Sequence, residues 1–307
     1  MDNQYSDPLP RYPESALVEN ILSPDLNSQI AIQSRAEAAT QMCWTCGSCD
    51  SECPVNIATG RLRPQRIVRL ASLGLMDELL RSPEIWYCIS CRRCFEVCPN
   101  LVKPSTIIAF TRYAMVANRV LSIEKVTAYR ELFAQFQRVR WYAAAKCMQG
   151  EFDPISEKTF KDWLRTPVAH ASDVIPINQI MRRSVDFRSA IYNFNISVCF
   201  SCGECSSACP VSCERSIFDA RTIFRMANLG LKDLLLNSPS LWLCISCGRC
   251  SDACSQLVDG RNLIGDLQQM AVERGTVDSG FRFRLQEANK IIYAYLLAQI
   301  DSVLSFA

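Results

Sequence analysis

Sixteen of the eighteen cysteines in this 307-residue chain fall into four copies of the spacing C-x2-C-x2-C-x3-C. Such a run is typical of cubane iron–sulfur clusters, because three close thiolates reach one cluster and the fourth turns toward another. Four runs therefore predict four [4Fe–4S] clusters. The runs are Cys43, Cys46, Cys49 and Cys53; Cys88, Cys91, Cys94 and Cys98; Cys199, Cys202, Cys205 and Cys209; and Cys244, Cys247, Cys250 and Cys254.

Two other uses of cysteine match the pattern less well. A structural zinc ion takes four ligands, so the third cysteine of each triplet would be redundant, and a zinc-bound interaction module is a remote alternative. A disulfide scaffold is typical of short secreted chains, and the first 30 residues contain no apolar stretch that would act as an export signal. We therefore expect a cytoplasmic, reducing and anaerobic setting.

Composition excludes several classes of function. The net charge of +2 does not indicate a nucleic-acid partner, and no apolar run reaches the 18 residues typical of a membrane span. The chain has a single histidine, His170, and neither a Walker A run nor a G-x-G-x-x-G motif. We expect no nucleic-acid partner, no direct membrane span and no catalytic site in this chain itself.

The chain is an internal duplication with an offset of 156 residues. Cys43 aligns with Cys199 and Trp86 with Trp242, and no gap is needed between them. Similarity that continues between the cysteine runs indicates a true repeat, because the cysteine spacing alone could arise twice independently.

Two cysteines lie outside the runs. Cys147 lies in an alanine-rich helical stretch, and Cys213 aligns with Ile57 and is expected to be a small buried residue.

Apolar spacing predicts helices throughout, and almost no alternating strand pattern is present. Ile67, Leu70 and Ala71 follow the i, i+3, i+4 rule after the first run, and the second half repeats this pattern. Gly74 and Gly230 suit the left-handed position that follows a helix. The expected fold is all-α, with clusters at helix ends and further helices over 104–116, 120–145, 260–272 and 283–306.

Each half resembles the C subunit of heterodisulfide reductase. The resemblance is carried by two cysteine runs about 35 residues apart, C-G-x-C inside the first run, G-L before a Ser-Pro turn, and I-W-x-C or L-W-x-C entering the second run. It covers residues 43–116 and 199–272. The family subunit has one such domain, whereas this chain has two. We expect four segments: a tail or docking arm (1–42), a helical ferredoxin-like domain (43–150), a linker (151–198), and a second such domain with a C-terminal helix (199–307).

The resemblance also implies how the cysteines are shared. In proteins with this helical ferredoxin domain, the fourth cysteine of each run completes the cluster of the other run in its half. Carried onto this sequence, the rule implies four ligand sets. Set one is Cys43, Cys46, Cys49 and Cys98; set two is Cys88, Cys91, Cys94 and Cys53; set three is Cys199, Cys202, Cys205 and Cys254; and set four is Cys244, Cys247, Cys250 and Cys209.

The leading functional hypothesis is an electron-transfer subunit of a heterodisulfide-reductase-like multisubunit oxidoreductase, which relays electrons through four clusters. The resemblance implies a B-like partner with Cys-Cys-Gly motifs and a flavin-bearing A-like partner, with a further electron-donor module as an option. The alternative is the iron–sulfur subunit of a flavin-dependent dehydrogenase of the glycolate oxidase or glycerol-3-phosphate dehydrogenase type. Those subunits look similar locally, so the partners distinguish the two hypotheses.

Overall fold

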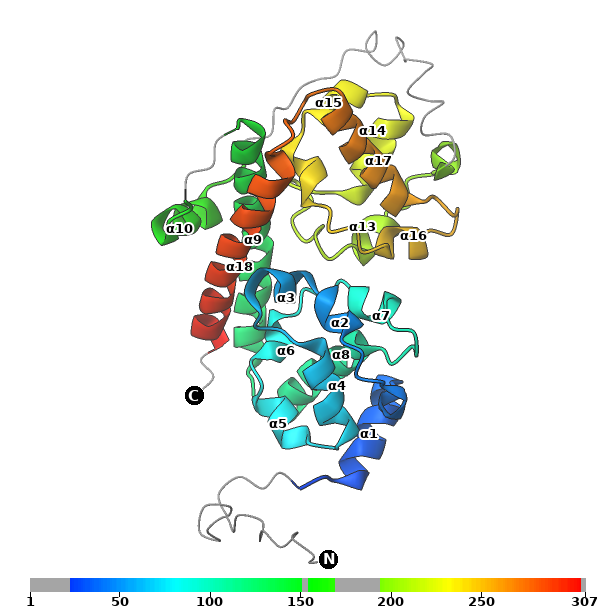
Figure 1. Cartoon of the computed structure of the whole chain (residues 1–307), viewed down its shortest axis with the longest axis vertical. Helices are drawn as coiled ribbons and strands as arrows, with labels where there is room; N and C mark the ends of the chain where they lie inside the picture. The colour runs from blue at the N-terminus through cyan, green and yellow to red at the C-terminus, as the bar shows by residue number, and fades with distance from the viewer. Residues whose placement is uncertain (1–22, 151–153, 169–193, 305–307) are drawn as a thin grey trace, which may run out of the picture.

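The computed structural model describes residues 23–150, 154–168 and 194–304, so His170 lies outside the described residues. Within these ranges the regular secondary structure is entirely helical, which confirms the predicted all-α fold. Figure 1 shows two groups of short helices stacked along the long axis of the molecule. Two long helices, α9 (Ile123–Met148) and α18 (Phe281–Leu304), run beside both groups.

The two groups repeat one order of elements. The first half contains α1 (Leu26–Ala36), η2 (Thr40–Met42), α2 (Ser48–Ser51), α3 (Pro54–Thr59), α4 (Pro64–Ser72), α5 (Met76–Arg81), α6 (Glu84–Tyr87), α7 (Arg93–Glu96) and α8 (Pro104–Ala117). The second contains η4 (Ile196–Val198), α13 (Glu204–Ala208), α14 (Ala220–Asn228), α15 (Lys232–Leu236), η5 (Pro239–Leu243), α16 (Arg249–Asp252) and α17 (Gly260–Glu273). Between α9 and the second half lies α10 (Glu157–Arg165).

Helices α4 and α14 show how the repeat builds its core. Each buries one apolar face, which includes Ile67 and Ala71 in α4 and Ile223 and Ala227 in α14, as the sequence spacing predicts. Proline at the first position begins α4, where a missing N–H costs nothing. The glycines that follow these helices have φ of 69° and 74°, so both predicted left-handed ends are confirmed.

Helices α9 and α18 pack along each other and tie the two halves together. At one end, the α18 carboxylate of Asp301 accepts hydrogen bonds from Tyr87 (2.5 Å) and Arg61 (2.9 Å) in the first half. Helix α9 contacts the second half, where the Arg138 guanidinium donates to the Glu214 carboxylate at 3.0 Å. The C-terminal helix therefore packs on the body of the molecule.

Helix α1 lies inside the range 1–42 that the sequence suggested as a tail or docking arm. Its N-cap Asp25 accepts hydrogen bonds from Asn27 and Ser28, and the Asp25 N–H donates to the Leu73 carbonyl at 3.0 Å. The helix also contacts α4 and α8, and Ile32 is fully buried. Residues 26–36 are thus part of the first packed half, while residues 1–22 lie outside the described residues.

Candidate iron–sulfur centres

Each cysteine run forms a loop that leads into a short helix, and the third cysteine lies in α2, α7, α13 or α16. Two positions of every loop have left-handed backbone geometry. Alternating left- and right-handed residues turn successive N–H groups toward one side, and such concave backbones are common at iron–sulfur sites. The positions are Thr45, Ser90, Ser201 and Ser246, with φ of 53–60°, and Gly47, Arg92, Gly203 and Gly248, with φ of 65–94°.

The same backbone turn points N–H groups at the cysteine sulfurs. The N–H of Thr45 donates to Cys43 Sγ at 3.4 Å, and that of Ser90 donates to Cys88 Sγ at 3.3 Å. Such hydrogen bonds stabilise the thiolate form and are one of the factors that set cluster potentials. Sequence reasoning missed these donors, although a small hydroxyl residue in all four runs was a visible signal. An equivalent bond runs from Ser246 to Cys244 at 3.4 Å. The fourth cysteines accept from a residue four positions later, Cys98 from Val102 and Cys254 from Val258, both at 3.4 Å.

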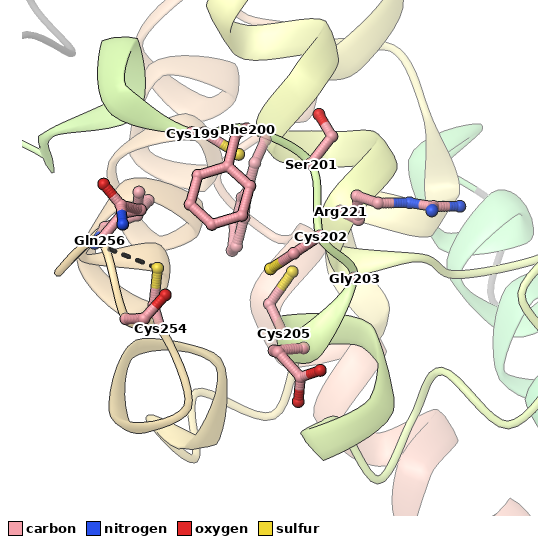
Figure 2. A pocket seen from close by; sticks show the side chains of 13 residues that line it. Cys199, Phe200, Ser201, Cys202, Gly203, Cys205, Arg221, Cys254 and Gln256 are labelled. Carbon is pink, nitrogen blue, oxygen red and sulfur yellow. Dashed lines mark hydrogen bonds between the residues drawn. The ribbon is translucent and has the colours of Figure 1, made fainter.

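The clearest grouping of cysteines lies in the second half (Figure 2). One cavity is lined by Cys199, Cys202 and Cys205 of the third run together with Cys254 of the fourth. The sulfurs of Cys202, Cys205 and Cys254 point toward the same space from two sides. The structure therefore brings together all four members of ligand set three, drawn from two different runs.

The electrostatics of Cys53 and Cys250 place cysteines of different runs near each other in each half. Burial is the main cause that raises the pKa of the Cys53 thiol to about 11, and the negative charge of Cys88 contributes to this rise. Burial also raises the pKa of Cys250 strongly, with added contributions from Cys244 and Cys209. The fourth cysteine of the first and third runs therefore lies within electrostatic range of the following run.

In each half, a side-chain hydrogen bond ties the loop after the second run to the entry of the first. The Asn100 side chain, two residues after Cys98, donates to the carbonyl of Met42 at 2.6 Å, immediately before the first run begins. In the second half, the side chain of Asn195 similarly donates to the Leu257 carbonyl at 3.3 Å. Cys98 aligns with Cys254 at the offset of 156 residues, so we expect it to lie beside the first run as Cys254 lies beside the third.

Burial governs the protonation of these thiols before any metal binds. Removal from water disfavours the thiolate, so burial raises the pKa of Cys49, Cys91 and Cys244 to about 12. Cys46 is the opposite case, because a hydrogen bond with the Ser48 hydroxyl lowers the pKa of this exposed thiol. Metal ligation needs the deprotonated sulfur, so cluster assembly must release protons from the buried positions.

Two arginines place positive charge beside the second and fourth runs. Arg112 donates to the carbonyls of Ile85 (2.9 Å) and Cys88 (2.5 Å) in the first half. At the equivalent position the second half has Gln268, which donates to Leu241 at 2.9 Å, and Arg140 of α9 approaches the same corner. Arg140 is buried and donates to the carbonyl of Leu243 at 2.8 Å.

The donor set fits a cubane iron–sulfur cluster. All eighteen cysteines are free thiols, and the sixteen in the runs supply the soft sulfur ligands that iron–sulfur clusters take. In the part of the chain that the structure describes, no group of three or more His, Cys, Asp or Glu side chains is arranged to hold a single metal ion. Among the helices in the same ranges, none combines the length and apolarity of a membrane span.

Cys147 and Cys213 occupy different environments. Cys147 is buried in α9, as its alanine-rich surroundings predict. The expectation that Cys213 is a buried small residue is wrong, because the residue is exposed, like Ile57 at the equivalent position. Its sulfur is nevertheless turned toward the Val211 and Phe133 carbonyls, at 3.7 and 3.9 Å. This partial withdrawal from water raises the pKa of Cys213 to about 11, and burial raises that of Cys147 to about 11.

We expect iodoacetamide to label Cys213 slowly and Cys147 only after unfolding. Alkylation requires the thiolate, and below its pKa the labelling rate rises about tenfold per pH unit. A raised pKa means that the Cys213 rate should still be climbing at pH 9.5, whereas an ordinary thiol levels off near its pKa of about 8.5. Mass spectrometry of anaerobically labelled, cluster-loaded protein measures both rates. A plateau near pH 8.5, or equal labelling of both residues, would contradict this expectation.

The fold and the grouped cysteines define an all-α protein with two iron–sulfur modules. A family model described as a 4Fe–4S dicluster domain matches residues 39–102 and residues 195–258. The chain therefore carries two tandem 4Fe–4S dicluster domains. The predicted internal duplication and the iron–sulfur character of the chain are confirmed.

The relatives of these domains point to one kind of protein. The chain is 32% identical over 96 residues to the iron–sulfur C subunit of the CoB–CoM heterodisulfide reductase of Methanopyrus kandleri, covering 29% of this chain and 50% of that protein. It is 38% identical over 89 residues to the corresponding C 2 subunit of Methanocaldococcus jannaschii, covering 28% and 47%. It is 41% identical over 75 residues to the C subunit of the H(2):CoB-CoM heterodisulfide,ferredoxin reductase of Methanothermobacter thermautotrophicus, covering 24% and 38%.

These matches span half or less of the length of the relatives. The similarity to heterodisulfide reductase C subunits that the cysteine motifs predicted is confirmed over this part of the chain. What the tandem arrangement adds is a second dicluster domain in the same polypeptide.

Proposed function

We propose that this protein is the iron–sulfur electron-transfer subunit of a heterodisulfide-reductase-like multisubunit oxidoreductase, with four [4Fe–4S] clusters held by ligand sets one to four. The observation that carries this proposal is the cavity shared by the third run and Cys254. A self-contained run would bring Cys209 to that cavity instead. The dicluster match in both halves and the similarity to C subunits support the assignment to a redox complex.

The bound clusters would supply reversible one-electron transfer. The chain contributes thiolates that anchor each site, N–H groups directed at sulfurs and, around Cys91 and Cys247, a buried environment that restricts the approach of water. Arg112 and Arg140 place fixed positive charge beside the second and fourth runs, which favours the more negative, reduced state of the nearby sites. In this proposal no residue acts as an acid, base or nucleophile, so bond chemistry takes place on a partner.

The partners in this proposal are a B-like protein with Cys-Cys-Gly motifs and an A-like flavoprotein, all in the cytoplasm. The alternative remains the iron–sulfur subunit of a flavin-dependent dehydrogenase. Purification from the native host separates the two, because the first requires a co-eluting protein with Cys-Cys-Gly motifs and the second a hydroxy-acid or glycerol-phosphate flavoprotein.

We expect anaerobically prepared protein to contain about 16 iron and about 16 sulfide per chain, since each cubane has four of each. Four complete ligand sets motivate this number. Chemical iron and sulfide analysis, with EPR of the reduced protein, measures it. An iron content that saturates near eight atoms per chain, or zinc in place of iron, would contradict the four-cluster proposal.

A further inference from the structure

One hydrogen bond joins the cysteine loops of the two halves directly. The Arg249 guanidinium donates to the carbonyl of Ser90 at 2.9 Å. Ser90 immediately precedes Cys91 in the second run, and Arg249 lies between Cys247 and Cys250 in the fourth. Figure 1 shows α7 and α16 on the facing sides of the two helix groups. The second and fourth runs therefore meet where the halves meet.

A cavity between the halves lies beside this contact, and its lining includes Arg93 of the second run and Cys244 of the fourth. Tyr293 of α18 is buried beside the same junction, where it lines this cavity with Cys244 and Arg140. Residues of the second and fourth runs therefore lie at the same junction between the halves.

Exposure distinguishes these two runs from the others. Cys91 and Cys247, the second cysteines of the second and fourth runs, are 7% and 8% exposed. The equivalent Cys46 and Cys202 in the first and third runs are exposed to solvent. Each of these is flanked by an exposed aromatic side chain at the same place in the repeat: Trp44 at 70% and Phe200 at 62%. The first and third runs are therefore open to solvent at their second cysteine and at the aromatic residue two positions before it.

We propose that ligand sets two and four form the inner pair through which electrons cross between the halves, so that the relay runs in the order one, two, four, three. The exposed sets one and three are then the two terminals where redox partners exchange electrons with this chain. This inference rests on the proposed function, because it requires all four sets to hold clusters. The duplicated domains face each other through their second runs, so the relay is continuous from one end to the other.

Spin–spin interaction between reduced clusters tests this order without any enzymatic assay. The matched variants replace the second cysteine of chosen runs: Cys46→Ala with Cys202→Ala leaves sets two and four, and Cys46→Ala with Cys247→Ala leaves sets two and three. Both variants should retain about eight iron. We expect the first to show a broadened, spin-coupled EPR signal after reduction and the second to show two uncoupled signals.

Equal coupling in both variants, or coupling only in the variant that retains sets two and three, would overturn the order. If the buried Cys247 site is needed for folding, Cys91→Ala with Cys202→Ala leaves sets one and four and provides the same uncoupled comparison.

The unsubstituted protein serves as the check on the proposed function. Iron far below about 16 per chain would reject the four clusters themselves, whereas full iron with the wrong coupling would reject only the order.

Discussion

Replacing Cys98 by alanine is expected to remove the cluster held by Cys43, Cys46 and Cys49 while leaving the cluster of the second run in place. Iron should fall from about 16 to about 12 per chain, and one EPR-active centre should be lost. The reason is the exchange of fourth ligands: the second half gathers Cys254 with the third run, and Cys98 has the same place in the first half.

Backbone geometry supports the same result. The Asn100 side chain binds the Met42 carbonyl at 2.6 Å, which holds the loop after Cys98 against the entry of the first run. Each fourth cysteine that ligates the cluster of the other run would therefore link the two cysteine runs of its half. Loss of Cys98 should loosen the half as well as remove a redox centre, so the apparent unfolding temperature should fall too.

The reciprocal variant and two controls make this test specific. Cys53→Ala should remove the cluster of the second run instead, and Cys213→Ala, a free thiol outside the runs, should leave iron unchanged. A Cys46→Ala variant identifies the EPR signal of set one. If Cys98→Ala spares that signal and loses the one that Cys91→Ala loses, the runs are self-contained and the crossed assignment fails.

Replacing Gly74 by alanine is expected to destabilise the first half by about 3 kcal/mol or more. A Cβ atom at this position would lie 1.8 Å from the carbonyl oxygen of Asp25, which belongs to the backbone and has no side-chain freedom. The φ of 69° adds the cost of a left-handed backbone for a residue with a Cβ. Relief would require α1 to move off the helices it covers.

Gly275 is the matched control, because its φ of 70° is nearly the same and no atom lies within 4 Å of its added Cβ. Gly275→Ala should cost only the backbone term of about 1 kcal/mol. Circular dichroism during anaerobic heating, followed together with iron release, compares the two variants. Equal losses of stability would mean that the contact between Gly74 and Asp25 contributes nothing.

Local patterns predicted the helices well where a single physical rule dominates. The apolar spacing at Ile67, Leu70 and Ala71 and the glycine that follows correctly predicted α4 and its end. The expected helices over 104–116 and 260–272 correspond to α8 and α17, because proline or a capping aspartate marks each beginning. Helix propensity, amphipathic spacing and end signals are all local properties.

Environment was harder to predict. Cys213 was expected inside because it aligns with an isoleucine, yet both positions are exposed in the fold. The N–H donors to sulfur also escaped notice, since they depend on left-handed backbone at Thr45 and its three counterparts. Residue type alone does not reveal how exposed a side chain is. Nor does it reveal a positive φ at a threonine or serine, because such residues, unlike glycine, rarely adopt left-handed backbone geometry.

The kind of cofactor, the number of cysteine runs and the duplication could all be predicted from the amino-acid sequence, because the spacing of the cysteines and the offset of 156 residues are read directly along the chain. Which run faces which could be learned only from the packed structure. The hydrogen bond between Arg249 and Ser90 joins residues 159 positions apart, and α9 and α18 orient the halves that make it. Such contacts depend on how two similar surfaces pack, and nothing in the spacing of either run specifies that packing.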